Sequence, residues 1–422
     1  MPSAQLLKTY AKEALWLTCA IAQALLQRLY DRVLRCLYAS ERRIPLSRAE
    51  LVRPNTLAQL LGTTVKTVSL GDSQRQQLSD ANELGAGGAG TRRYWLVQGT
   101  AAAGTRLFCK LPAETLFESL FLDIFGVYAN EVRFYNTKID APSHLFAKAY
   151  AAEMSRGRFV LCLEDVGARG VTFPVIDTPH AGDKVEAVLE ALATLHATCW
   201  GWPPRGVWND ETRPPFLRLI ADSTLRTIRK RWPDLLTADV VATGVEIYLS
   251  RRWRGGAVIF LTSAQVATYQ LYLDHYDTVR AHWSSGLLVL VHGDAHLGNV
   301  FFHEKDGSAG FYDMQCVAAE HPMRDVAYHL ILSCDSADLA RNERAYVEAY
   351  LRRIAAKGQS LSYEAAWREY RLHALWALTA LVISAGASAD YFAEGLARLT
   401  ISRAAAAVER VDARGALLDL ID

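Results

Sequence analysis

The sequence of 422 residues has no marked excess of charge of either sign. The chain has 46 Lys and Arg residues and 45 Asp and Glu residues. The net charge therefore provides neither the positive potential that attracts nucleic acid nor the negative potential that attracts polycations. We therefore expect no nucleic-acid partner. Hydrophobic residues at 51% and charged residues at 22% are typical of a globular chain that buries a large core.

Cysteine is also sparse, and its spacing has no pattern. None of the seven cysteines forms a C-x-x-C pair, and most of them lie within apolar runs. This spacing argues against a disulfide framework and against a zinc site built from cysteines. We expect reduced, buried thiols and a cytoplasmic protein.

Long hydrophobic runs are missing as well. The longest candidate, residues 14–26 (ALWLTCAIAQALL), is shorter than the roughly 20 residues that a transmembrane helix needs, and no cleavage site follows it. We predict no transmembrane segment. Leu7, Tyr10, Leu17, Ile21, Leu25 and Leu29 recur at helical spacing. The favoured interpretation is an amphipathic helix whose apolar side packs on the rest of the protein, and a membrane-surface or targeting helix is the alternative.

The residue patterns that predict secondary structure change along the chain. Short runs rich in β-branched and aromatic residues lie between residues 65 and 113 (VKTVSLGD, RRYWLVQG and TRLFCKLP), and they predict antiparallel strands. Beyond residue 167 the patterns are mostly helical, with one β-hairpin within 287–315. The further predicted elements are helices at 57–61, 118–139, 184–199 and from 325 onward, and a strand at 158–165.

These elements predict an α+β chain in three parts. A helical extension covers residues 1–45, a small β-rich lobe covers 46–162, and a helical lobe that carries the hairpin covers 163–422.

A glycine-rich segment, ELGAGGAGT at 83–91, contains the spacing G-x-G-x-x-G at Gly85, Gly87 and Gly90. The preceding segment is polar and the following one resembles a strand, which argues against a dinucleotide-binding loop. The context favours a flap whose backbone amides approach phosphates, with Gly87 and Gly88 as the contacts, over a plain flexible hairpin. No G-x-x-x-x-G-K-[ST] motif occurs.

Lys110 ends an apolar strand pattern, LFCK, and Glu131 follows in the first long helical pattern. A lysine in such a strand is costly unless its ammonium group has a partner. A strand lysine paired with a helix glutamate holds the α- and β-phosphates of ATP in kinases. We predict this pair.

Residues 291–315, VHGDAHLGNVFFHEKDGSAGFYDMQ, carry the strongest signal. Phosphoryl transfer needs one carboxylate beside the acceptor hydroxyl, and it needs hard oxygen ligands for Mg²⁺. Asp294 fits the first role, and Asn299 with Asp313 fits the second. We interpret His296 as a group near the γ-phosphate, with a purely structural histidine as the alternative. His292 is expected to anchor the loop.

The segments HGDAHLGN and FYDMQ resemble the catalytic and metal-binding loops of the aminoglycoside phosphotransferase and choline kinase superfamily. LEDVG at 163–167, LATLHATCW at 192–200 and HPMRDVAYHLILS at 321–333 are similar to the ecdysteroid-kinase-like branch of small-molecule kinases. The resemblance covers about residues 60–410. One departure is Met314, where relatives usually carry an aromatic residue.

This resemblance implies a protein-kinase-like fold of two lobes, with ATP and Mg²⁺ as cofactors. It places adenine against the segment that contains Leu163, Glu164 and Val166, and it makes Asp325 a brace of the catalytic loop. The predicted activity is phosphorylation of a hydroxyl group on a small molecule, with Asp294 as the base. The alternative is a catalytically inactive nucleotide-binding protein (a pseudokinase), and the absence of G-x-S-x-G argues against a hydrolase.

The acceptor stays open at this point, as does the oligomeric state. Net charge near zero and ten Trp residues favour a less charged, more apolar acceptor than an aminoglycoside. We expect some aromatic residues within 203–285 and in the C-terminal helices to line its site. The candidates are Trp283, Trp376, Tyr391 and Phe392.

Overall fold

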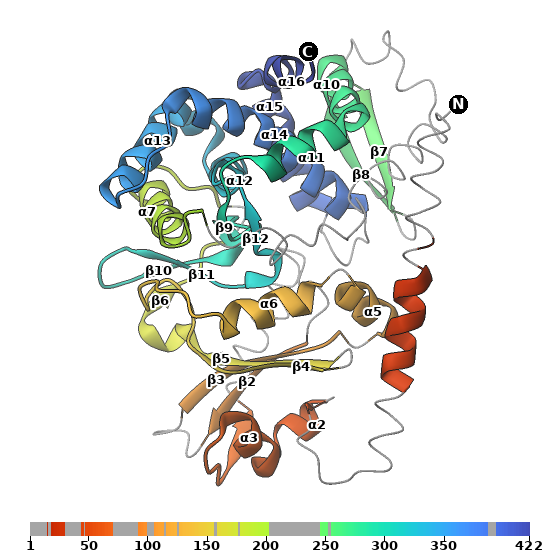
Figure 1. The fold of residues 1–422 in the computed structure, drawn as a ribbon, viewed down its shortest axis with the longest axis vertical. Coiled ribbons are helices and arrows are strands. Elements are labelled where there is room, and N and C mark those ends of the chain that lie inside the picture. Colours follow the sequence, from red (N-terminus) through yellow and green to blue (C-terminus); the bar gives the residue numbers. More distant parts are fainter. Residues whose placement is uncertain are drawn as a thin grey trace.

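The structure is a computed structural model, shown as a ribbon in Figure 1. It describes residues 15, 18–29, 44–45, 47–70, 92–98, 105–113, 115–124, 126–155, 158–175, 178–201, 245–251, 255–386 and 394–422.

A five-stranded antiparallel sheet forms the N-terminal part, in the order β1-β2-β3-β5-β4. The strands are β1 (Val68–Leu70), β2 (Arg92–Gln98), β3 (Thr105–Leu111), β4 (Ala149–Ser155) and β5 (Arg158–Glu164). All of them except β4 were expected from their β-branched and aromatic residues. The sequence AYAAEMS of β4 has few such residues, so only its pairing with β5 makes it a strand.

Helices cover both faces of this sheet. On one face lie α2 (Arg48–Leu51) and α3 (Pro54–Leu61), whose leucines share a core with β2, β3 and β5. On the other face, α5 (Leu116–Ile124) and α6 (Val127–Asn136) lie between the sheet and the helical part (Figure 1). The predicted single helix over 118–139 is therefore wrong. Gly126 separates the two helices in a left-handed conformation, with φ of 69°, which glycine adopts without steric cost.

The C-terminal part is mostly helical, as predicted. Its helices are α7 (Asp183–Thr198), α10 (Ser263–Asp274), α11 (Tyr276–Ser285), α12 (Met323–Ser333), α13 (Ser336–Ala356), α14 (Tyr363–Gly386), α15 (Glu394–Arg410) and α16 (Ala413–Ile421). They surround one large apolar core. The hairpin of β7 (Val245–Arg251) and β8 (Gly255–Leu261) was not predicted.

The predicted hairpin is present and carries the strongest motif. It consists of β10 (Val300–His303) and β11 (Ala309–Phe311), and β6 (Val171–Thr172) pairs with its outer side. Gly307 takes a left-handed φ of 70° in the turn. A second small sheet pairs β9 (Val289–Val291) with β12 (Ala318–Glu320). The loop between β9 and β10 is thereby held at both of its ends.

The N-terminal helix departs from expectation. Within its described part, 18–29, the side chains of Ile21, Leu25 and Leu29 are 38%, 43% and 58% exposed, so the predicted packing of that apolar side is wrong for these three. The helix meets α5 through Arg28 instead, which donates hydrogen bonds to the backbone oxygen and the hydroxyl of Ser119. None of the helices that the structure describes is both long and apolar enough to cross a bilayer.

Candidate active site

The loop that joins β9 to β10 begins with a glycine whose conformation is essential. Gly293 has a φ of 81°, and a Cβ atom at this position would lie 2.0 Å from the carbonyl oxygen of Cys316. Any side chain here would displace the chain that follows Asp313. The H-G-D motif therefore needs its glycine for close packing of two loops.

Asp325 of α12 holds the start of this loop. Its carboxylate accepts hydrogen bonds from the backbone N–H groups of His292 at 2.6 Å and Gly293 at 2.8 Å. His196 of α7 lies 3.2 Å from the same carboxylate, and the other nitrogen of His196 contacts the Tyr350 hydroxyl at 2.8 Å. Burial alone would raise the pKa of Asp325, but the hydrogen bond and charge of His196, the charge of His292 and the N–H of Gly293 lower it. The expected bracing contact is confirmed.

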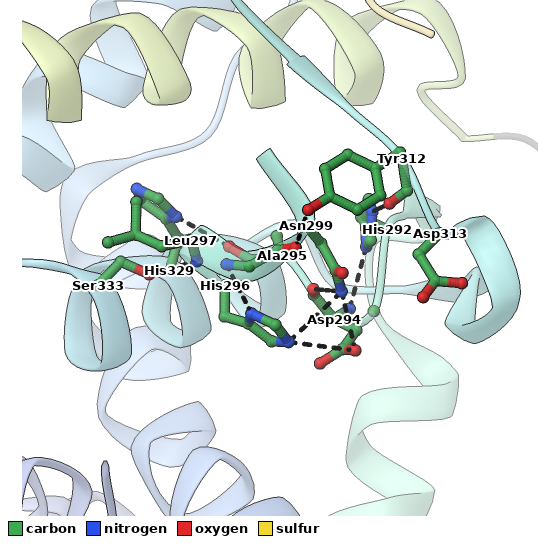
Figure 2. Close-up of polar contacts among 12 residues, drawn as sticks. His292, Asp294, Ala295, His296, Leu297, Asn299, Tyr312, Asp313, His329 and Ser333 are labelled. Carbon is green, nitrogen blue, oxygen red and sulfur yellow. Dashed lines mark hydrogen bonds and ion pairs between the residues drawn. The ribbon is translucent and has the colours of Figure 1, made fainter. Parts of the chain in front are cut away.

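Two further residues of α12 hold the middle of the loop. His329 Nδ1 lies 2.8 Å from the carbonyl oxygen of Ala295, and the Ser333 hydroxyl accepts the N–H of Leu297 at 3.1 Å (Figure 2). Burial lowers the pKa of His329 to about 4, so the ring is neutral at pH 7 and donates through Nδ1. A buried neutral imidazole thus stabilises the loop without adding charge beside Asp294.

Asp294, His296 and Asn299 converge at the end of the loop (Figure 2). The Asn299 side-chain amide donates to the backbone oxygen of Asp294 at 2.9 Å and to its carboxylate at 3.0 Å. This turns the Asn299 Oδ1 atom away from Asp294. His296 Nδ1 accepts the N–H of Gly298 at 3.0 Å, so a neutral His296 carries its proton on Nε2, 3.5 Å from the Asp294 carboxylate.

Tyr312 ties this loop to the one that follows β11. Its backbone oxygen accepts a hydrogen bond from His292 Nε2 at 3.0 Å, and its N–H donates to the Asn299 carbonyl at 3.1 Å. Its hydroxyl donates to the carbonyl of Gly298. Asp313, the next residue, is therefore positioned relative to Asp294 and Asn299 by three hydrogen bonds of its neighbour.

Asp313 itself has a φ of 63°, in the left-handed region that few residues other than glycine adopt. Its side chain reaches the sheet: Lys110 Nζ of β3 lies 2.7 Å from Asp313 Oδ1 and 2.7 Å from Glu131 Oε1 of α6. Lys110 is 3% exposed. The predicted pair of Lys110 and Glu131 is confirmed, and the second partner is a finding. Two carboxylates for one ammonium group leave this buried trio with a formal charge of −1.

The remaining predicted residues lie apart from this trio. Leu163 is buried in β5, opposite Phe108 of β3, and Val166 is buried in the 3₁₀ helix Val166–Arg169. The Glu164 carboxylate forms an ion pair with Arg169, whose hydrogen bonds lower the pKa of Glu164. Gly87 and Gly88 lie outside the described residues, as do Gly85 and Gly90.

Two neighbours of Asp294 were missed. Tyr328 of α12 packs its ring 6.4 Å from that of His296, and burial, followed by the charge of Asp294, raises the pKa of Tyr328 well above its usual value. Burial and then the charges of Asp294 and Asp313 also raise the pKa of the Cys316 thiol. Both groups stay protonated at pH 7. Tyr328 follows Asp325 by three residues, a spacing that places it on a neighbouring part of the same helix face.

The structure describes two of the four aromatic candidates for the acceptor site, and their role stays a prediction. Trp283 and Trp376 are buried, and the indole of Trp283 stacks on His373 with 4.6 Å between ring centres. Arg324 lies 4.3 Å above the ring of Trp376. Tyr391 and Phe392 lie outside the described residues.

The profile of the Ecdysteroid kinase-like family matches residues 98–363, which is more than half of the chain. The chain belongs to this family. The match includes Lys110, Glu131 and both loops of the site. The predicted α+β, protein-kinase-like architecture of an ecdysteroid-kinase-like protein is confirmed by the small antiparallel sheets and the large helical part.

Solved structures of small-molecule kinases are similar to the chain at low identity. Choline kinase from Cryptosporidium parvum is 11% identical, with 79% of this chain and 91% of that chain covered and a TM-score of 0.44. A microcompartment-associated aminopropanol kinase is 13% identical, with coverages of 81% and 97% and a TM-score of 0.41. Amicoumacin kinase, solved with AMP-PNP and Ca²⁺, is 11% identical, with coverages of 74% and 84% and a TM-score of 0.40. No curated protein sequence matches the chain.

Proposed function

We propose that this ecdysteroid-kinase-like protein transfers the γ-phosphoryl group of ATP to a hydroxyl group of a small molecule. One observation carries the proposal. A buried lysine of the sheet contacts the carboxylate that follows β11, while the loop before β10 holds a second carboxylate beside an asparagine amide. Phosphoryl transfer is catalysed mainly by positioning and electrostatics, and these are the charges it needs.

Lys110 is the residue proposed to hold the α- and β-phosphates. Its contact with Glu131 orients the ammonium group. Lys110 pairs with Leu161 of β5, and adenine is proposed to bind farther along the chain, at Leu163, Glu164 and Val166. Gly87 and Gly88 are proposed to cover the phosphates. We also propose the lobe boundaries at 45/46 and 162/163.

Asn299 and Asp313 are the proposed ligands of Mg²⁺. A carboxylate and an amide oxygen are hard donors that suit this ion. Among the described residues, the hydrogen bonds of Asn299 use its nitrogen and not Oδ1, and Asp313 supplies a carboxylate at the end of the hairpin, so the residues present fit a divalent cation. When bound, Mg²⁺ would neutralise charge on the phosphates of ATP.

Asp294 is proposed to orient the acceptor hydroxyl and to take its proton. The Asn299 amide donates to its carboxylate, while Tyr328 and Cys316 stay uncharged beside it. In this scheme, the proton of His296 Nε2 points toward the region between Asp294 and the γ-phosphate. A pseudokinase is the second candidate, but all five chemical positions carry the residue types that catalysis requires (Lys110, Glu131, Asp294, Asn299 and Asp313).

A metabolite screen tests the proposal. The full chain is incubated with ATP, MgCl₂ and a library that contains sterols, amino alcohols, sugars and other alcohols, and mass spectrometry detects products that gain one phosphate. Asp294→Asn, incubated in parallel, is the control for contaminating kinases. Persistent absence of phosphorylated products, together with measured Mg·ATP binding, would favour the pseudokinase.

A further inference from the structure

A cavity of about 410 Å³ lies in the C-terminal part, away from the site described above. It opens between α13, α14 and the junction of α15 with α16. Four arginines line it: Arg341, Arg344, Arg371 and Arg410. Its two carboxylates are those of Glu343 and Asp412, so the lining has a formal charge of +2, from four cations and two anions.

Both carboxylates are already engaged by two of the arginines. The Glu343 carboxylate is buried and accepts hydrogen bonds from Arg410 Nε and Nη2, both at 2.8 Å, and from the Tyr370 hydroxyl at 2.8 Å. Asp412 accepts Arg371 Nη2 at 2.5 Å and the N–H of Gly415 at 3.1 Å. Arg410 makes two parallel hydrogen bonds to Glu343, a pairing of fixed geometry. Arg371 is held at Asp412 through both the carboxylate and the backbone oxygen.

The other two arginines supply the excess charge. The guanidinium group of Arg344 lies 4.4 Å above the ring of Trp367, and its Nη1 atom donates to the Tyr363 hydroxyl at 3.1 Å. Among the described residues, no carboxylate lies within ion-pair distance of Arg344. Arg341, one turn earlier on α13, has only a 4.0 Å contact with Asp338, whose carboxylate also accepts hydrogen bonds from Asn342 and Tyr346. Trp367 and Tyr363 hold Arg344 in place, so little side-chain entropy is lost when it binds a ligand.

We infer that this cavity, hereafter the arginine pocket, binds a small molecule that carries a phosphate group. Planar guanidinium groups match phosphate oxygens in pairs. A volume of this size accommodates a metabolite and not only an ion. A pocket confined to α13, α14 and the junction of α15 with α16 also favours a small molecule over a nucleic-acid backbone, which needs an extended basic surface.

Two sources supply this chemistry. One is a phosphorylated alcohol, the class of product that the proposed reaction makes, and the other is free inorganic phosphate. The arginine pocket does not depend on the proposed function, because every contact that builds it lies on α13, α14, α15 and α16.

Calorimetry on the full chain tests the inference, with Mg·AMP-PNP saturating so that the cleft is occupied. Inorganic phosphate and glycerol 3-phosphate are the probes, at an ionic strength matched with NaCl. We expect binding in the millimolar range or tighter, and a loss of about tenfold or more in Arg341→Gln/Arg344→Gln, equal to about 1.4 kcal/mol. Tighter binding of the ester would indicate a phosphorylated alcohol, and equal binding would indicate free phosphate.

A matched control is available on the same helix. Arg352 has the same side-chain exposure as Arg341, 69%, and lies outside the pocket lining. Arg352→Gln should bind both probes as the unsubstituted protein does. Arg344→Lys, which keeps the charge but loses the planar fork, should weaken binding. The inference is overturned if neither probe gives more heat than NaCl, or if the double variant and Arg352→Gln bind equally.

Discussion

Two clusters of ion pairs in the molecule have opposite formal charges. One is the trio of Lys110, Glu131 and Asp313, and the other is the arginine pocket. In the trio, two carboxylates share one buried ammonium group at 2.7 Å each. In the pocket, four arginines surround two carboxylates, and Arg341 and Arg410 are partly open to water. The two formal charges agree with the two proposed ligands, a cation at Asp313 and an anion in the pocket.

The surroundings of the two clusters differ as much as their charges. The trio is buried, so a cation bound at Asp313, as proposed, would be screened little by water and should have a large effect on stability. In the pocket, water already screens the excess charge, and a bound anion contributes less. The predictions below therefore run from strong effects near the trio to weak ones at the pocket.

The largest effect is expected for Asp294→Asn. The substitution removes the proposed proton acceptor but keeps the shape of the side chain, so kcat should fall by about 10²- to 10⁴-fold. Steady-state kinetics with an acceptor found in the screen measures this. The melting temperature and the Mg·ATP affinity should stay close to those of the unsubstituted protein. Near-normal turnover in a folded variant would show that Asp294 is not the base.

The second largest effect is expected for Asp313→Ala. It removes a proposed Mg²⁺ ligand and leaves the trio neutral, so the affinity for Mg·ATP should fall by about tenfold or more, or about 1.4 kcal/mol. Titration calorimetry with and without MgCl₂ gives the comparison. The metal dependence of ATP binding should disappear in the variant. If both affinities are unchanged, Asp313 holds no metal.

Acid should destabilise the C-terminal core, including the contact of His329 with the loop that joins β9 to β10, and should leave the arginines of the pocket charged. Burial lowers the pKa of His321 to about 3 and the pKa values of His329 and His373 to about 4. In the unfolded chain, the same histidines become protonated below about pH 6.5, while in the folded protein they stay neutral down to their lowered pKa values. The free energy of unfolding should therefore fall as the pH drops from about 6.5 toward 4. Each histidine contributes about 1.4 kcal/mol per pH unit.

Urea denaturation at several pH values between 7 and 5 measures this slope. His329→Gln should reduce the slope of the free energy of unfolding against pH by the contribution of one histidine, whatever the substitution does to stability at pH 7. The arginines of the pocket do not titrate in this range. A slope that is the same in His329→Gln would contradict the burial argument.

The smallest effect concerns salt. Raising NaCl from about 0.05 M to about 0.5 M shortens the screening length to a few ångströms, so phosphate binding at the arginine pocket should weaken several-fold. The ion pairs of Lys110 are buried and should not respond. Phosphate binding that is insensitive to salt would mean that the probe binds elsewhere by other forces.

Much of the site could be predicted because it is local in the chain. Asp294 and Asn299 are five residues apart, and a hairpin returns Asp313 to them, so spacing and turn chemistry were sufficient. Lys110 and Glu131 were also found from their order. Their roles, like the lobe boundaries, stay predictions.

The contacts across long sequence separations could not be predicted. Lys110 and Asp313 are 203 residues apart, and His196 and Asp325 are 129 apart. Periodicity marks these residues as buried but says nothing about which partner each one meets. In the N-terminal helix, the spacing of Ile21, Leu25 and Leu29 correctly indicates an apolar side. It does not indicate what covers that side, and the three side chains are exposed.

The left-handed backbone of Asp313 sets function against robustness in one residue. A side chain in this conformation costs on the order of 1 kcal/mol. Glycine at this position would relieve this backbone penalty while removing the proposed metal ligand. A library selected for heat resistance alone would therefore enrich glycine here, and its most durable members would be the ones that had lost the chemistry.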